Sequence, residues 1–136
     1  MKKILTVGVY DYFHLGHLRL FKQCKEHADY LIVAVQDGKC IKKTKPNANV
    51  LYTTEQRIEL IEAIRIVDEV TVYQDVDKSI PNIEFDIFAV GEDQNHDGFQ
   101  RAVNWCKLNG KEVIRLKRTK GISSSDIKQE IEQDSN

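Results

Sequence analysis

Short apolar runs recur along this chain and alternate with stretches whose apolar residues follow a helical period. Runs bounded by polar or turn-forming residues are typical of strands, and we predict strands at 3–9, 30–35, 69–73, 85–90 and 112–116. The helical periods predict helices at 16–27, from about 54 onward, at 98–108 and at 127–133. Strands that alternate with helices predict an α/β fold, with a five-stranded parallel sheet and helices on both faces.

Polar residues mark where several of these elements begin and end. Thr53 and Gln56 have the spacing of a capping box, and Gly110 is placed to end the helix before it. Residues 123–126 are suited to cap the final helix. Residues 37–52 show no period and are rich in lysine, so we expect a loop there.

The bulk properties narrow the class of protein. A chain of 136 residues is expected to form one domain, residues 1–136. The net charge of −1 gives no general basic field, so we do not expect nucleic acid as a partner. No apolar run approaches the ~20 residues that cross a bilayer, so we expect no membrane partner. Three cysteines without a C-x-x-C spacing suggest reduced thiols, and we expect a cytoplasmic protein.

The junction between the first strand and the first helix is rich in glycine and histidine. Ligands of an open α/β sheet bind at such strand ends, where helix N-termini present free N–H groups and a partial positive charge that suit phosphate. His14 and His17 can donate hydrogen bonds to phosphate oxygens. We expect Gly16 to allow a tight turn or the close approach of a phosphate.

Residues 8–17 read G-x-x-D-x-x-H-x-G-H, which resembles the signature of the cytidylyltransferases, nucleotidyltransferases with a small Rossmann-like fold. The likeness is greatest to the short bacterial glycerol-3-phosphate cytidylyltransferases. Residues 118–125 read R-T-K-G-I-S-S-S and resemble the family's R-T-x-G-I-S-T-T/S segment. Two motifs about a hundred residues apart and in the family's order are far more specific than H-x-G-H alone. The resemblance also covers the middle of the chain and so spans nearly all of it.

The resemblance assigns roles to the first motif. It implies that His14 and His17 contact the α- and β-phosphates of the nucleotide and stabilise the transition state at phosphorus. Val9 and Tyr10 would offer backbone N–H groups near the phosphates, which does not depend on their side chains. Asp11 is counted among the acceptor-binding residues; it would lie beside the site, where it either orders the histidines or caps a turn.

The second motif is expected to hold the β- and γ-phosphates. The planar guanidinium of Arg118 suits two phosphate oxygens, and hydroxyl and N–H groups at a helix start can form an anion cradle. The nucleotide-binding residues implied here are Thr119, Gly121, Ile122, Ser123 and Ser124. Without the resemblance, the serines would be ordinary helix caps and Arg118 a solvated surface residue.

Further cations are expected around the acceptor. The resemblance implies that one lysine of the 37–52 loop, Lys43 or Lys45, reaches over the phosphates. We favour Lys43 as the catalytic one, with Lys45 near the acceptor; without the resemblance, such a run is most often only solvated. Arg57 and Arg65 are two helical turns apart and should share a face, which the resemblance places near the acceptor phosphate and the nucleotide. The alternative is an exposed stripe that pairs with Glu62 or Asp68.

The end of the fourth strand departs from the family's pattern. Asp93 is expected to contact the nucleoside end of the substrate. The family usually has tryptophan after this aspartate, and here Gln94 follows, in a region expected to shape the acceptor pocket. We interpret His96 as a surface histidine of a loop.

These residues favour phosphate handling over covalent catalysis, because the chain has no G-x-S-x-G nucleophile elbow. The resemblance implies that a phosphate monoester attacks the α-phosphorus of CTP, releasing pyrophosphate and forming a CDP-alcohol. Glycerol 3-phosphate is the first candidate acceptor, with CDP-glycerol serving cell-surface polymers. We expect Mg²⁺ to arrive on the CTP phosphates, because no dedicated metal-ligand spacing is present. The family also suggests a homodimer.

Three alternatives remain open. The acceptor could be phosphocholine, phosphoethanolamine or another polyol phosphate. A quaternary ammonium would need an aromatic cage, for which the candidates show no cage spacing; they are Tyr10, Tyr12, Tyr52 and Trp105. The enzyme could be an adenylyltransferase, because few contacts select the base. It could also be a non-catalytic nucleotide-binding module, against which the intact histidine pair argues.

Overall fold

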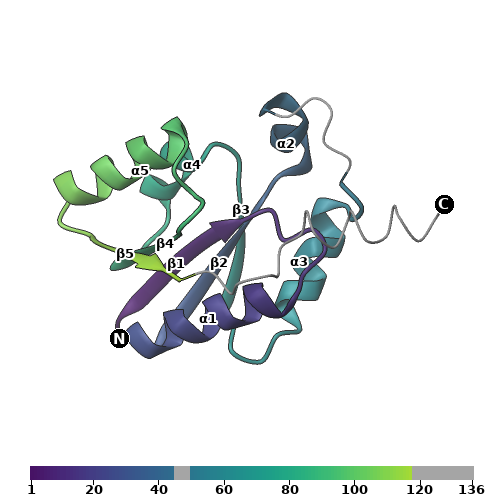
Figure 1. Cartoon of the computed structure of the whole chain (residues 1–136), viewed down its shortest axis with the longest axis horizontal. Helices are drawn as coiled ribbons and strands as arrows, with labels where there is room; N and C mark the ends of the chain where they lie inside the picture. The colour runs from purple at the N-terminus through teal and green to yellow at the C-terminus, as the bar shows by residue number, and fades with distance from the viewer. Residues whose placement is uncertain (45–49, 118–136) are drawn as a thin grey trace.

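The computed structural model describes residues 1–44 and 50–117. A five-stranded sheet with the order β3-β2-β1-β4-β5 and parallel pairing throughout forms its centre (Figure 1). The strands are β1 Lys3–Gly8, β2 Tyr30–Gln36, β3 Glu69–Tyr73, β4 Ile87–Gly91 and β5 Glu112–Leu116. The helices are α1 Leu15–His27, α2 Gly38–Thr44, α3 Thr54–Glu62, α4 Val76–Ser79, the 3₁₀ helix η1 Ile80–Asn82 and α5 Asp97–Leu108.

Helices cover both faces of this sheet, as the sequence predicts (Figure 1). Alternate strand residues face opposite sides, so each face has its own apolar core. Ile4 of β1 packs in one core with Phe21 of α1 and Ile61 of α3. Leu5 packs in the other core with Phe99 of α5. The α/β Rossmann-like class is therefore confirmed.

The predicted ends of two helices are confirmed at atomic level. The Thr53 hydroxyl accepts from the Gln56 N–H at 3.1 Å, and the Gln56 side chain accepts from the Thr53 N–H at 3.0 Å. This reciprocal pair is the capping box expected from the spacing. Gly110 follows α5 with φ of +71°, the left-handed conformation that commonly ends helices.

The prediction of a loop throughout 37–52 is wrong in its first half, where α2 forms. Asp37 caps the start of this helix. Its carboxylate accepts from the Lys39 N–H at 2.9 Å, and its carbonyl accepts from the Cys40 N–H at 3.0 Å. Ile41 is then buried against the body of the protein. The short helices α4 and η1 were also unexpected. The predicted helix at 127–133 lies outside the described residues.

The described part of the chain contains no helix that is both long and apolar enough to cross a membrane.

Candidate active site

The loop that follows β1 has a strained backbone. Tyr10 and Tyr12 have φ of +56° and +52°, a region that costs non-glycine residues about 1 kcal/mol or more each. The Tyr10 ring folds back over Gly8, where an added Cβ would lie 2.8 Å from the ring. Gly16 instead lies within α1 without a positive φ, so the expectation of a tight turn at Gly16 is wrong. The turn is made by the two tyrosines.

The two histidines of this loop cap α1 together. His14 is the N-cap residue, and its Nδ1 accepts from the Gly16 N–H at 3.0 Å. His17, in the first turn, accepts the His14 N–H on its own Nδ1 at 3.2 Å. The rings stack with centroids 3.9 Å apart. Because Nδ1 accepts in both rings, each neutral imidazole carries its proton on Nε2.

The environment keeps His17 uncharged near neutral pH. Burial, and then the proximity of His14, lower the pKa of His17 to about 4. Tyr10 and Phe13 flank its ring, with centroid distances of 5.4 and 5.3 Å. The N-terminus of α1 therefore carries a neutral His17 beside its own partial positive charge, and the Nε2–H of this ring is a donor suited to phosphate oxygens.

Arg57 of α3 is fully buried and joins the strand ends. Its guanidinium donates to the carbonyls of Val9 and Gln36, both at 2.8 Å. It also donates to the Tyr52 carbonyl at 3.3 Å and the Thr54 hydroxyl at 3.2 Å. These bonds fasten the carboxyl ends of β1 and β2 to the start of α3.

The expected shared face of Arg57 and Arg65 is wrong. Arg57 points into the protein, whereas Arg65 lies beyond the end of α3 and is exposed. Burial lowers the pKa of Arg57, and the nearby Asp11 carboxylate opposes that shift. Asp11 is itself buried and accepts from the Leu51 and Tyr52 N–H groups at 2.7 and 3.0 Å. It therefore holds the 51–52 segment against the β1–α1 loop.

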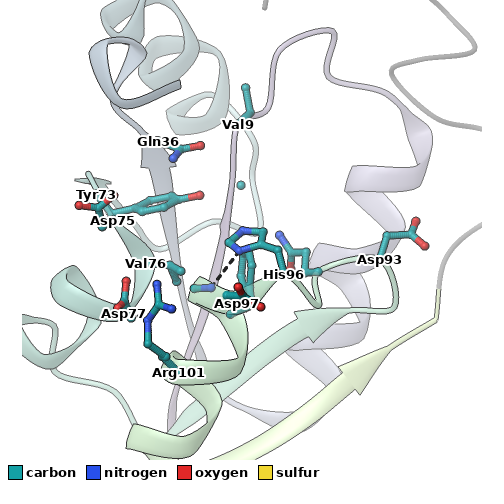
Figure 2. Close-up of a pocket in the computed structure, with 14 residues that line it drawn as sticks. Val9, Gln36, Tyr73, Asp75, Val76, Asp77, Asp93, His96, Asp97 and Arg101 are labelled. Carbon is teal, nitrogen blue, oxygen red and sulfur yellow. Dashed lines mark hydrogen bonds and ion pairs between the residues drawn. The ribbon is translucent and has the colours of Figure 1, made fainter. Parts of the chain in front are cut away.

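A cavity of about 630 Å³ opens at the carboxyl ends of β1, β2 and β3, beside the start of α5 (Figure 2). Val9 and Asp93 both line it, which brings two of the predicted nucleotide-binding residues to one hollow. Gln94 closes the end of β4 onto β1, because its side chain accepts from the Gly91 N–H and donates to the Val7 carbonyl, both at 2.9 Å. Glutamine thus has a structural role at the position where the family usually has tryptophan.

His96 is exposed, as expected, but it also lines this cavity and caps α5. Its Nδ1 accepts from the Gly98 N–H at 3.1 Å, the same H-x-G geometry that His14 and Gly16 form on α1. An added Cβ on Gly98 would lie 2.9 Å from the His96 ring, so the glycine makes room for the cap. The repeated H-x-G spacing was a sequence signal for this helix start.

Further residues of the cavity were not predicted from the sequence. They are Gln36, Tyr73, Asp75, Val76, Asp77, Asp97, Phe99 and Arg101. They come from the ends of β2 and β3, from α4 and from α5. The carboxylates of the described lining residues are those of Asp75, Asp77, Asp93 and Asp97. Nothing in local periodicity indicates that these segments meet.

Several other predicted residues are not brought together with the histidines by the described structure. Lys43 is exposed in the last turn of α2. A second cavity of about 610 Å³ beside α2 is lined by Lys39 and Lys42 and does not include Lys43. Outside the described residues lie Lys45, Arg118, Thr119, Gly121, Ile122, Ser123 and Ser124. The described residues contain no group of three histidine, cysteine or acidic side chains that could hold a metal ion.

The alternative pairing of Asp68 with Arg65 is also wrong. Asp68 lies at the amino ends of the strands and pairs with Lys25 of α1 at 2.8 Å, while the same oxygen accepts from the Leu31 N–H at 2.8 Å. Partial burial would raise the pKa of Asp68, but the bonds from Lys25 and Leu31 lower it overall. This cluster joins α1 to β2 and β3 at the end of the sheet away from the histidines.

Comparison with known proteins agrees with this architecture. The model of the cytidylyltransferase-like family matches residues 5–130. A glycerol-3-phosphate cytidylyltransferase of Staphylococcus aureus is 37% identical over 96% of both chains. An FAD synthase of Thermococcus sibiricus is 35% identical over 84% of this chain and 79% of its own.

Among solved structures, a lipopolysaccharide core biosynthesis protein of Thermoplasma volcanium has a TM-score of 0.75. It is 24% identical and covers 88% of this chain and 98% of its own, so it supports the fold alone. The family match extends from β1 past β5 and includes both histidines that cap α1. The chain therefore belongs to the cytidylyltransferase-like family of nucleotidyltransferases.

Proposed function

We propose that this protein transfers the cytidylyl group of CTP to the phosphate of a small phosphoalcohol, with glycerol 3-phosphate as the first candidate. An oxygen of the acceptor phosphate attacks the α-phosphorus, the bond from that phosphorus to the bridging oxygen breaks, and pyrophosphate leaves. The products are then CDP-glycerol and pyrophosphate. The S. aureus relative, aligned over nearly the whole chain, supports this acceptor.

The observation that carries the proposal is the hydrogen-bonded histidine pair on α1. Each Nδ1 accepts a backbone N–H, so the proton of a neutral imidazole is on Nε2, from which it can be donated to a phosphate oxygen. Negative charge that grows on phosphate oxygens in the transition state is stabilised best by donors that are already in place. A neutral His17 can serve as such a donor without first gaining a proton.

Other groups complete the proposed site. We assign Arg118, Thr119, Gly121, Ile122, Ser123 and Ser124 to the phosphates, together with Lys43 or Lys45. Mg²⁺ is proposed to enter on the CTP phosphates, where it would neutralise charge, since the described residues offer no ready cage of their own. We further propose a cytoplasmic homodimer whose product serves cell-surface polymers.

The test is pyrophosphate release by the purified protein. Release should require both CTP and a phosphoalcohol, with glycerol 3-phosphate compared against phosphocholine, phosphoethanolamine and longer polyol phosphates. Binding of CTP without turnover on any acceptor would indicate a nucleotide-binding module instead. Release without an acceptor would indicate hydrolysis and would contradict the proposed transfer.

The FAD synthase relatives support a second candidate, an adenylyl transfer. FAD joins an adenylyl group to a flavin phosphate, which is also a phosphate monoester, so the same histidine geometry would serve. The same assay with ATP and FMN distinguishes the two reactions. Faster release with ATP and FMN than with CTP and glycerol 3-phosphate would favour the second candidate.

A further inference from the structure

The hydroxyl group of Tyr73 faces the cavity and has no hydrogen-bond partner in the part of the chain that the structure describes. Tyr73 is the last residue of β3, only 4% of it is exposed, and it lines the 630 Å³ hollow. No hydrogen bond to its hydroxyl exists within residues 1–44 and 50–117. Those residues also contain no fully buried side-chain oxygen that lacks a partner, so this oxygen must contact the cavity. Figure 2 shows the ring reaching from the end of β3 between Gln36 and His96.

Among the described residues, the charged side chains that line this hollow are mainly negative, while the buried Arg57 guanidinium, which does not line it, adds a positive charge near the Tyr73 hydroxyl. Four of the described aspartates and one described arginine line the hollow, and this arginine, Arg101, already pairs with Asp77 at 2.8 Å. The Asp75 carboxylate lies 3.9 Å from the exposed ammonium group of Lys78, which makes a weak ion pair. It makes no capping hydrogen bond to α4. Such a lining repels phosphate groups and accepts hydrogen bonds from hydroxyl groups.

We propose that this cavity binds the hydroxyl-bearing end of a polyol phosphate acceptor, and that Tyr73 and Asp75 determine specificity for its hydroxyl groups. The inference rests on the proposed cytidylyl transfer. The terminal hydroxyl of the acceptor, farthest from its phosphate, donates to the Asp75 carboxylate, and the Tyr73 hydroxyl bonds to the same or the neighbouring hydroxyl. The acceptor phosphate stays outside the acidic hollow, toward the histidines on α1.

Tyr73→Phe and Asp75→Asn test these contacts in the full-length enzyme. Neither change removes a hydrogen bond within the described protein, so the melting temperature should stay unchanged. Each variant should raise KM for glycerol 3-phosphate about three- to tenfold while KM for CTP stays constant. A rise in KM for CTP instead would place the nucleoside in the cavity, and no change in either KM would show that the cavity takes no part; both results overturn the proposal.

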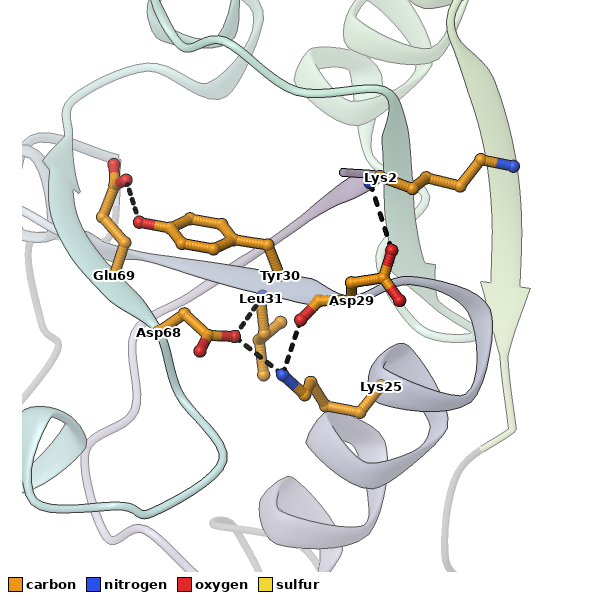
Figure 3. Close-up of polar contacts among 7 residues, drawn as sticks. All are labelled: Lys2, Lys25, Asp29, Tyr30, Leu31, Asp68 and Glu69. Atoms are coloured by element: carbon orange, nitrogen blue, oxygen red, sulfur yellow. Dashed lines mark hydrogen bonds and ion pairs between the residues drawn. The ribbon is translucent and has the colours of Figure 1, made fainter.

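Tyr30→Phe is the matched control. Its hydroxyl donates to Glu69 at 2.9 Å at the amino ends of β2 and β3, on the other end of the sheet (Figure 3). The same loss of one phenolic oxygen should leave both KM values unchanged. An effect of Tyr30→Phe equal to that of Tyr73→Phe would show a general response to the substitution and overturn the assignment.

A deoxy acceptor makes the test specific to hydroxyl recognition. Propane-1,2-diol 1-phosphate lacks the terminal hydroxyl of glycerol 3-phosphate and should have a higher KM with the wild type. If Tyr73 or Asp75 binds that hydroxyl, the corresponding variant should discriminate less between the two acceptors. If, in both variants, the missing hydroxyl raises KM by the same factor as in the wild type, the effects of substitution and deoxygenation are independent, and the proposal is overturned.

The two levels of failure are distinguishable. A preference for phosphoethanolamine over glycerol 3-phosphate that Asp75→Asn abolishes would show that the cavity selects an ammonium group, and would overturn a polyol site. If the wild type transfers cytidylyl groups but the variants behave normally, only the cavity assignment fails. If the wild type uses no phosphoalcohol with CTP, the proposed function fails and this inference falls with it.

Discussion

Removing the Arg57 side chain should destabilise the protein more than removing any exposed arginine. The guanidinium is fully buried and donates four hydrogen bonds, three of them to main-chain carbonyls. In Arg57→Ala, the carbonyls of Val9 and Gln36 lose these donors, and the buried Asp11 carboxylate loses a nearby positive charge. The strand ends that support the histidine loop would also lose their common anchor.

The magnitude follows from this count. Hydrogen bonds to a charged group contribute about 1.5–3 kcal/mol each, but desolvation of the guanidinium offsets much of the sum. Breaking a buried charged cluster by removing one partner costs about 3–5 kcal/mol, so we expect a loss of about 4 kcal/mol in the free energy of unfolding. At about 3–4 °C per kcal/mol for a domain of this size, the melting temperature should fall by about 14 °C.

Urea denaturation followed by circular dichroism measures this loss. Arg57→Lys keeps the charge but cannot span all four acceptors, so it should lose about half as much. Arg65→Ala, at an exposed position, is the control and should change stability by less than about 0.5 kcal/mol. A loss below about 1.5 kcal/mol in Arg57→Ala would refute the idea that this side chain holds the strand ends together.

Three further predictions concern the histidine loop. In His17→Gln, the glutamine side chain can still accept the His14 N–H and complete the cap, so the free energy of unfolding should change little. The variant lacks the imidazole Nε2–H, so kcat in the pyrophosphate assay should fall about 10²–10³-fold. An unchanged kcat would reject the role of Nε2. Because the pKa of His17 is lowered to about 4 in the folded protein, the unfolded chain binds more protons between about pH 4 and 6.5, so stability should rise with pH across that window. His17→Gln should flatten this rise in denaturation curves, and an equal slope in both proteins would assign it to other groups. Gly8→Ala places a Cβ 2.8 Å from the Tyr10 ring and should lower the free energy of unfolding by about 1–3 kcal/mol in urea titrations. The control is Gly110→Asn, at an open position with positive φ, which should lower it by less. Equal losses in the two variants would contradict the packing argument.

Features fixed by neighbouring residues were accessible from the sequence. The capping box of Thr53 and Gln56 and the glycine after α5 depend on contacts within a few positions of the chain. The strands were found because buried parallel strands are almost continuously apolar. The α2 helix was missed because its seven residues carry little periodic signal and its stability comes from Asp37 and the buried Ile41.

The position of Arg57 shows where such reasoning ends. Helical spacing placed it on the same face as Arg65, but its main partners are carbonyls 48 and 21 positions away. A residue that is charged and fully buried has no local pattern of its own. Only the meeting of β1, β2 and α3 explains why arginine is buried there.

The sequence by itself determined the order of strands and helices, the helix caps and the histidine motif, because those features arise from spacing and short-range hydrogen bonds. The tertiary structure alone decided which strand ends lie side by side, and so which residues share a cavity. Tyr73 and Asp75 lie near one another at the end of β3, whereas His96 lies between β4 and α5; they meet only because the parallel order β3-β2-β1-β4-β5 brings these strand ends to one edge. Contacts across that edge depend on the arrangement of whole strands, which no local pattern of residues encodes.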